Sequence, residues 1–300
     1  MRPSSAVAVI ATFLAASFPH PHSGPAGFVG AIELPRDLGP GFGGLSALEL
    51  SPDGMNFVTL SDRGNMFQGT FRREGGQFVG VTVANARRLR DTKGDMIEAE
   101  VLDPEGLAVR ADGTVFVSFE KLNEIGAYGR ESVAQTALPT SPDFSDLGPN
   151  KGLEALAIDD QGRLYTLPEK APHRGPYPIW RLESGKWSVL DTLPRKGGFL
   201  PVGADFGPDG RFYLLERAFG LDGFRSRVRS FQVSDAGLSD ELHILQTDRH
   251  RFGNLEGLAV WRAPSGAIRL SMVSDDNFAS FLPSEIVEFE LPLAEGREKH

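Results

Sequence analysis

One hairpin pattern occurs five times in this chain, and this repeat constrains the fold more than any other feature of the sequence. Each copy has an apolar strand, a turn centred on Asp-Gly or an equivalent pair, and a second apolar strand that ends in acidic and usually basic residues. The copies span residues 46–63, 105–121, 154–170, 202–217 and 256–277. They begin 48 to 59 residues apart, which is the length of a four-stranded propeller blade and not of a helical repeat.

The acids at the strand ends are placed symmetrically about each turn. The midpoint between Glu105 and Glu120 falls on an Asp-Gly pair, and the midpoint between Glu154 and Glu169 falls on Gln-Gly. Glycine supplies the positive φ that a tight hairpin turn requires. A hairpin centred there brings the start of its first strand beside the end of its second. We therefore expect the terminal acids of every blade to lie on one face.

Further strands complete the blades. Two apolar strands follow the third hairpin and two follow the fourth, but only residues 285–292 follow the fifth. Residues 28–35 form a spare strand of the same kind. We predict an all-β fold, a β-propeller of four-stranded blades whose ring is closed by the N-terminal strand. Five blades are counted, or six if a degenerate blade lies in the long first interval. Residues 28–300 then form a single domain with little helix.

The N-terminus has the features of a targeting segment. Arg2 precedes an uncharged apolar run over residues 5–17, which is too short to span a bilayer and ends in small residues. We predict a signal peptide over residues 1–17 and a loose leader over residues 18–27, and hence a periplasmic or secreted protein. The alternative is a poorly ordered N-terminal tail.

Composition excludes several classes of function. With 31 Lys and Arg against 40 Asp and Glu, the chain is acidic and contains no basic run that would bind nucleic acid. Beyond the N-terminal run the sequence has no long apolar stretch, so no membrane span is expected. The absence of cysteine excludes disulfides, thiolate zinc sites, iron–sulfur clusters and cysteine nucleophiles.

Several motifs within the repeats resemble those of a known family. They are GLSAL with LSDRG (44–48, 60–64), DPEGLAV (103–109), NKGLEALA (150–157), LLERAF (214–219), and NLEGLAV with VSDDNF (254–260, 273–278). In this order they make residues 41–291 similar to the bacterial secreted propellers named for an esterase-like activity of phytase. The resemblance implies hydrolysis of esters or phosphoesters.

Familiar hydrolase motifs are missing. The sequence has no Gly-x-Ser-x-Gly elbow, no phosphate-binding GxxxxGK[ST] loop and no HExxH helix. The histidines outside the leader are scattered without the spacing of metal ligands. The chemistry is therefore expected to depend on carboxylates.

Carboxylates of the repeats form the predicted site. The candidate metal ligands are Glu105, Glu154, Asp205, Glu256, Asp275 and Asp276, and the second strands add Asp62, Glu120, Glu169 and Glu216. Such oxygen donors suit Ca²⁺ or Mg²⁺, and Ca²⁺ is favoured outside the cytoplasm. A bound cation would polarise the substrate and lower the pKa of a water nucleophile.

Basic residues are expected around the same face. The candidate substrate-binding residues are Arg63, Lys121, Lys170, His173, Arg217 and Arg251. They could hold the anionic group of a small ester or phosphoester. We further predict catalytic roles for His250, Glu256 and Glu154, with His250 as the general acid for the leaving group.

Other interpretations remain open at this stage. The repeated acid–base pairs could serve only to join neighbouring blades around the axis. Our leading hypothesis is an exported hydrolase that acts through metal-activated water. A non-catalytic propeller that binds a ligand or a partner is the main alternative, and a metal-dependent lactonase is a third, by analogy of fold alone.

Overall fold

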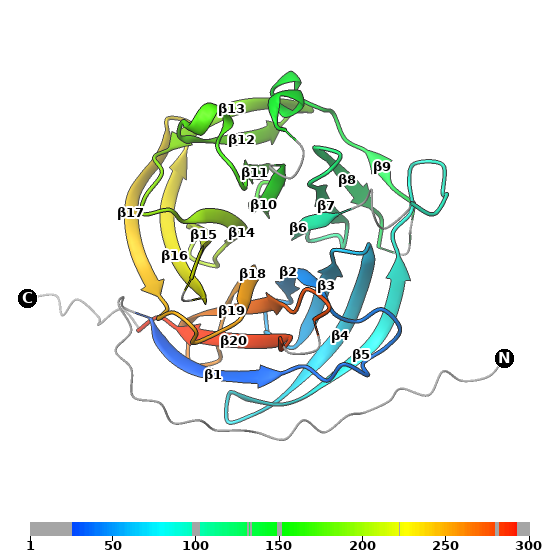
Figure 1. The fold of residues 1–300 in the computed structure, drawn as a ribbon, viewed down its shortest axis with the longest axis vertical. Coiled ribbons are helices and arrows are strands. Elements are labelled where there is room, and N and C mark those ends of the chain that lie inside the picture. Colours follow the sequence, from blue (N-terminus) through cyan, green and yellow to red (C-terminus); the bar gives the residue numbers. More distant parts are fainter. Residues whose placement is uncertain are drawn as a thin grey trace, which may run out of the picture.

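The computed structural model describes residues 26–97, 103–130, 132, 134–148, 152–221, 223–279 and 282–292. Within these residues, five four-stranded antiparallel sheets form a ring around a central axis (Figure 1). The predicted five-bladed β-propeller is therefore confirmed. The predicted signal peptide (residues 1–17) and nearly all of the predicted leader (residues 18–27) lie outside the described residues.

The first two blades follow the chain from the axis outwards. Blade 1 consists of β2 (Leu45–Leu50), β3 (Asn56–Ser61), β4 (Asn65–Glu74) and β5 (Gln77–Arg88). Blade 2 consists of β6 (Pro104–Val109), β7 (Val115–Phe119), β8 (Glu124–Tyr128) and β9 (Thr136–Ala137). The long strands β4 and β5 occupy much of the interval between the first and second copies of the repeat. Both strands belong to blade 1, and the described residues of this interval therefore form no sixth blade.

The third and fourth blades have the same order. Blade 3 consists of β10 (Leu153–Ile158), β11 (Leu164–Pro168), β12 (Tyr177–Glu183) and β13 (Lys186–Leu193). Blade 4 consists of β14 (Leu200–Phe206), β15 (Phe212–Gly220), β16 (Gly223–Ser234) and β17 (Gly237–Gln246). The helices of the described residues are two short 3₁₀ turns, η1 (Pro142–Asp146) and η2 (Pro172–Arg174). Helix content is thus small, as predicted.

Blade 5 joins the two ends of the chain. It consists of β18 (Asn254–Arg262), β19 (Ile268–Asp275), β20 (Glu285–Glu290) and β1 (Gly27–Glu33). The first strand β1 pairs antiparallel with β20, from Gly27 opposite Glu290 to Glu33 opposite Glu285. The predicted closure by the N-terminal strand is confirmed, and no open edge is left on β20.

The turns that define the repeat have the expected backbone. All five glycines at these turns have positive φ, between 69° and 89°: Gly54, Gly113, Gly162, Gly210 and Gly266. In blade 2, the N–H of Gly113 donates to the carbonyl of Arg110 at 2.8 Å. The carboxylate of Asp112 accepts from the N–H of Thr114 at 2.9 Å. The Asp-Gly pairs therefore set the hairpins as predicted.

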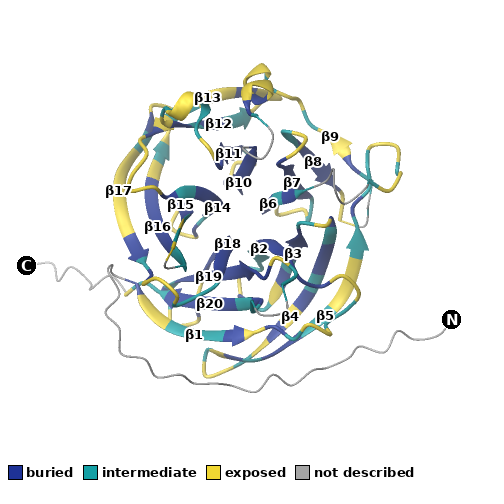
Figure 2. Ribbon diagram, in the orientation of Figure 1, coloured by how far each residue is buried: buried dark blue, intermediate teal, exposed yellow. Residues whose placement is uncertain are grey.

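The core lies between neighbouring blades and close to the axis. Figure 2 shows the innermost strands buried and the outermost strands β1, β5, β13 and β17 partly exposed. The innermost strands approach one another so closely that some positions require glycine. A Cβ on Gly106 would lie 2.4 Å from the carbonyl oxygen of Glu154, and one on Gly203 would lie 2.4 Å from that of Glu256. Real Cβ atoms do not approach so closely, so the narrow axis excludes side chains here.

Each innermost strand has a β-bulge at the same place. The pairing register shifts around Ser46 in β2, Glu154 in β10, Val202 in β14 and Glu256 in β18. In β6 it shifts between Pro104 and Leu107, a segment that includes Glu105. A bulge takes a residue out of regular pairing and changes the direction of its side chain. The three glutamates thereby come to the same end of the axis.

Candidate functional site

A pocket of about 330 Å³ lies at this end of the axis. Most of its polar lining is charged, with eight carboxylates against three cations and two amides. The carboxylates are Asp62, Asp103, Glu105, Glu120, Glu154, Glu169, Glu256 and Asp275. The cations are Lys121, Lys170 and Arg217, and the amides are Asn254 and Asn277. We call this cavity the acidic pocket.

The acids come from three positions of the repeat. Glu105, Glu154 and Glu256 are the residues at the bulges. Asp103 directly precedes the first strand β6, and the remaining four acids lie at or just after the ends of the second strands: Asp62, Glu120, Glu169 and Asp275. The N–H groups of Asp62 and Glu120 donate to the carbonyls of residues 44 and 103, each at 2.9 Å, and so extend their hairpins by one pair. The hairpin geometry brings these side chains together from four blades, as the symmetry about the turns had indicated.

Blade 4 breaks the pattern. Arg217, opposite Leu200 in the pairing of β14 with β15, occupies the place that Glu169 has in blade 3. The expectation that Glu216 would face the pocket is wrong. Its carboxylate is 1% exposed and accepts bidentate hydrogen bonds from Arg227 and Arg229 at 2.7 to 2.9 Å. Glu216 therefore holds strands of its own blade together.

Arg217 joins blades 3 and 5 across the pocket. Its Nη2 lies 2.9 Å from Oε1 of Glu169, and its Nη1 lies 2.5 Å from Oε1 of Glu256. Nη1 also donates to Oδ1 of Asn254 at 2.8 Å. The guanidinium that we expected to bind substrate is thus already engaged by the protein, and it neutralises part of the acidic charge.

Two groups of carboxylates have the geometry for a metal ion. Ligand oxygens of Asp103, Glu105 and Glu120 lie within 4.8 Å of one another, and so do those of Glu120, Glu154 and Glu169. Glu120 belongs to both groups. These donors are all hard oxygens, which suit Ca²⁺ or Mg²⁺ better than a transition metal. The residues present therefore fit the predicted divalent cation.

Burial makes this concentration of negative charge unfavourable without a cation. Burial, followed by repulsion from neighbouring carboxylates, raises the pKa of Glu120 to about 7 and places those of Glu105 and Glu154 well above the usual range. Burial, opposed by Arg217, raises the pKa of Glu256 to about 8. It also raises the pKa of Asp62 to about 7. A bound cation would favour the ionised forms of all these groups.

The stability of the metal-free protein should therefore fall as the pH rises from about 5 to 8. In this pH range the folded state keeps protons on Glu120, Asp62 and Glu256 that the unfolded chain has already lost. Because the folded state binds more protons than the unfolded state, a rise in pH lowers the free energy of unfolding. We expect the Tm after EDTA treatment to be several degrees lower at pH 8 than at pH 5. Excess Ca²⁺ should reverse most of this loss at pH 8, because it binds the deprotonated carboxylates. A Tm that is constant or higher at pH 8 without cation would contradict this expectation.

Two of the predicted metal ligands lie outside the acidic pocket. Asp205 accepts a hydrogen bond from the backbone N–H of Val260 at 2.6 Å, and its charge interacts with Glu49. Asp276 accepts from the N–H groups of Gly44 at 2.8 Å and Phe278 at 3.0 Å. Both carboxylates satisfy backbone donors, the first between blades 4 and 5 and the second between blades 5 and 1. Asp275, by contrast, lines the pocket.

The predicted histidines and arginines are dispersed. His250 is exposed in the connection between β17 and β18, outside the acidic pocket, and so is not placed beside Glu154 and Glu256. The guanidinium of Arg63 stacks on the ring of Phe278 at 3.5 Å. That of Arg251 stacks on Phe28 and Phe252 at 4.9 and 5.1 Å. Loop conformation, which the repeat does not encode, decides these positions.

His173 lines a neighbouring cavity, which also includes Lys170. Lys170 lines the acidic pocket as well and forms an ion pair with Glu169. Lys121 forms an ion pair with Asp103 at 3.1 Å. Of the six predicted substrate-binding residues, the structure therefore places Lys121, Lys170 and Arg217 in the acidic pocket.

Sequence reasoning missed two residues of the pocket. Asp103 and Asn254 each stand two positions before a bulge glutamate, Glu105 and Glu256 respectively. Nδ2 of Asn254 donates to Oε1 of Glu256 at 2.8 Å. Alignment of the five copies would have found both residues, because an oxygen-bearing side chain recurs at this position in blades 2 and 5.

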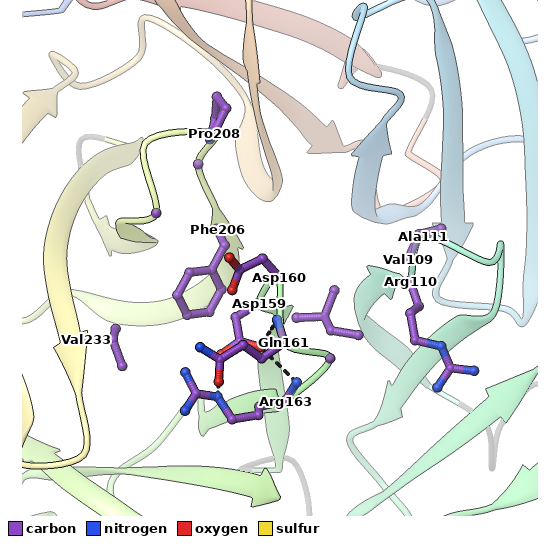
Figure 3. A pocket seen from close by; sticks show the side chains of 14 residues that line it. Val109, Arg110, Ala111, Asp159, Asp160, Gln161, Arg163, Phe206, Pro208 and Val233 are labelled. Atoms are coloured by element: carbon purple, nitrogen blue, oxygen red, sulfur yellow. Dashed lines mark hydrogen bonds and ion pairs between the residues drawn. The ribbon is translucent and has the colours of Figure 1, made fainter.

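The opposite end of the axis has a cavity of about 680 Å³ between the turns of blades 2, 3 and 4 (Figure 3). Two acids, Asp159 and Asp160, line this cavity, and Asp159 forms hydrogen bonds within its own hairpin. The carboxylate accepts from Nε of Arg163 at 2.6 Å and from the hydroxyl of Tyr165 at 3.0 Å. This larger cavity lacks the converging carboxylates of the acidic pocket, and we do not assign it a catalytic role.

Comparison with known proteins gives one informative match. A family model described as "Phytase-like: Esterase-like activity of phytase" matches residues 40–278. No curated protein matches the chain.

Several solved propeller structures are weakly similar to this chain. Virginiamycin B lyase from Staphylococcus aureus has a TM-score of 0.47 and 11% identity, covering 96% of this chain and 99% of its own. Regucalcin from Agrobacterium tumefaciens, a calcium-binding protein, has a TM-score of 0.47 and 10% identity, covering 84% and 92%. The PQQ-bound aldose sugar dehydrogenase from Streptomyces coelicolor has a TM-score of 0.45 and 14% identity, covering 89% and 99%. These similarities do not contribute to the assignment of a site.

Proposed function

This chain belongs to the phytase-like family described by an esterase-like activity of phytase, and from this premise we propose that it is an exported hydrolase of small anionic phosphoesters or carboxylic esters. We place the reaction in the acidic pocket and propose that the pocket holds a divalent cation, Ca²⁺ in preference to Mg²⁺. The observation that supports this most strongly is the excess of eight carboxylates over three cations in one pocket. The described part of the chain has no helix with the length and apolar character that crossing a membrane requires.

Glu120 is the central ligand in this proposal. It would hold the cation together with Asp103 and Glu105, or together with Glu154 and Glu169. The cation would polarise the substrate oxygen and lower the pKa of water at the site. Glu154, for which we predicted a catalytic role, acts in this proposal as a ligand.

The remaining groups position the substrate and handle protons. Lys121 and Lys170 are 36% and 44% exposed, so their ammonium groups can attract an anion from solvent to the pocket. Glu256 lies outside both groups of ligands and is held through Oε1 by Arg217 and Asn254. A carboxyl group fixed in this way, with its pKa raised to about 8 by burial, can exchange a proton with the leaving oxygen. This role replaces the one expected of His250.

Metal titration combined with a hydrolysis assay tests the proposal. We expect Ca²⁺ to raise the Tm of the EDTA-treated protein by several degrees, because a ligand of the native state stabilises it. Hydrolysis of p-nitrophenyl phosphate or p-nitrophenyl acetate should depend on the cation and stop on chelation. Cation binding without turnover of esters, phosphoesters or lactones would favour a non-catalytic binding propeller. Turnover of lactones alone would favour the lactonase alternative, and neither binding nor turnover would reject the proposal.

A further inference from the structure

A second cavity, of about 570 Å³, adjoins the acidic pocket on the same face of blade 3. Three connections of this blade form it: residues 146–148 before β10, residues 170–174 after β11, and Arg195 after β13. Lys170 lines both this cavity and the acidic pocket. The two cavities therefore lie side by side and have Lys170 as a common wall residue. We call the second cavity the basic cavity.

The charge of the basic cavity is opposite to that of the acidic pocket. Lys170, Arg174 and Arg195 line it together with His173, against the single acid Asp146. In the acidic pocket the carboxylates outnumber the cations. An anionic group without a compensating cation would be repelled by the acidic pocket and attracted by the basic cavity.

The walls of the basic cavity are ordered by contacts within blade 3. Tyr177 is 1% exposed, and its hydroxyl donates to the carbonyl of Phe199 at 3.1 Å. Burial raises the pKa of the Tyr177 hydroxyl, and the charge of Arg195, which also interacts with this tyrosine, opposes that rise. His173 and Arg174 have positive φ values of 52° and 59°, a conformation that is uncommon for residues other than glycine. Such strain in a loop often accompanies a functional role.

This arrangement departs from the short connections of blades 1, 2 and 4. Three residues connect β3 to β4, four connect β7 to β8 and two connect β15 to β16, whereas residues 169–176 connect β11 to β12. Blade 5 also has a long connection here, residues 276–284. The longer connection of blade 3 contains both His173 and Arg174. The additional residues are thus found where the chain can form a cavity beside the acidic pocket.

We propose that the basic cavity binds a second, non-reacting anionic group of the substrate, a carboxylate or a phosphate. The substrate class is then an ester that carries an anionic group apart from the bond that is cleaved. Arg174 and Arg195 are the specificity residues, since a guanidinium binds either anion in a bidentate manner. This inference rests on the proposed function for the identity of the reaction, but anion binding in the basic cavity can be measured without any turnover.

Matched esters test the substrate class. We expect the wild-type protein to have a kcat/KM about 10-fold higher for the monoanion mono-p-nitrophenyl glutarate than for neutral p-nitrophenyl acetate. Arg174→Gln and Arg195→Gln should remove most of this preference by raising KM for the glutarate ester, with p-nitrophenyl acetate unaffected. Arg110→Gln, an equal change of charge at the opposite face, should leave the preference intact. Equal kcat/KM for the two esters in the wild type would overturn the inference and leave the proposed function standing.

Direct binding separates the two proposals. Calorimetric titration with inorganic phosphate and with glutarate should give binding that the double variant Arg174→Gln/Arg195→Gln weakens about 10-fold. The relative affinities show whether the cavity takes phosphate or carboxylate. Binding that is lost in the double variant, in a protein that hydrolyses neither ester, would refute the proposed hydrolysis and support the anion site. Binding that the double variant does not change would overturn the anion site. Both arginines are exposed, so an unchanged Tm confirms that the variants are folded.

Discussion

Deletion of residues 26–33 should abolish the cooperative unfolding transition of the propeller. These residues contain β1, which pairs with β20 over its whole length, and the buried side chains of Ala26 and Ile32. The deletion also exposes Phe289 and Val287, which are buried in the intact ring. Loss of these contacts amounts to about 5 kcal/mol, which is comparable to the whole stability of many domains. Thermal unfolding followed by near-ultraviolet circular dichroism would show a broad transition, or none.

A circular permutant provides the matched control. In the native pairing Gly27 lies opposite Glu290, so β1 begins where β20 ends. Residues 26–35 placed after residue 292 through a short linker can therefore form the same pairs as a β-hairpin. We expect this rearranged chain to recover a sharp transition. A truncated protein with the same Tm as the intact one would show that the pairing of β1 with β20 does not contribute to the stability of the propeller.

Substitution of Glu120 by glutamine should reduce Ca²⁺ affinity and hydrolysis by about 100-fold or more. Glu120 belongs to both groups of carboxylates that can hold a cation, so either arrangement loses a charged ligand. A change of this size corresponds to about 3 kcal/mol. Isothermal titration with Ca²⁺ and initial rates on p-nitrophenyl phosphate and p-nitrophenyl acetate would measure the two losses.

Stability provides the internal control for this variant. The pKa of Glu120 is raised by burial and by repulsion from Asp103 and Glu169, so its neutral replacement should not lower the Tm of the metal-free protein. Asp160→Asn makes the same change of charge at the opposite face (Figure 3) and should change neither affinity nor rate. Unchanged Ca²⁺ affinity in Glu120→Gln would remove Glu120 from the site. A lower Tm would attribute the loss to misfolding.

The fold could be predicted almost completely from the sequence, because it depends on local rules that recur. Each turn glycine adopts the positive φ that its place in the repeat requires. The closing strand was recognisable because residues 28–35 had no partner in their own part of the chain. The lengths of the outer strands, which lie outside the repeated hairpin, were harder to predict. The strands β4 and β5, with 10 and 12 residues, lengthen the first interval without adding a blade.

The acidic pocket could be predicted in part, for a related reason. Residues fixed by the hairpin register, such as Glu105 and Glu154, lie where the symmetry about the turns indicated. In blade 4, Glu216 was aligned with Glu120 and Glu169 because it is also a glutamate. In blades 2 and 3, however, the bulge residue and the acid after the second strand are fifteen residues apart, and the same interval counted from Val202 leads to Arg217. Residues in loops, such as His250, are positioned by backbone conformations that no repeat specifies.

The bulge that recurs in all five innermost strands has a consequence for how such a protein can change. A residue at a bulge faces the axis without belonging to the regular ladder of backbone pairs, so its replacement leaves the register of the strand intact. Three of these five places carry glutamate here, and Ser46 and Val202 occupy the others. The propeller thus has five positions around its axis at which the side chain can be replaced independently. Evolution or design can alter the ligand chemistry at its centre one blade at a time, while the surrounding framework stays the same.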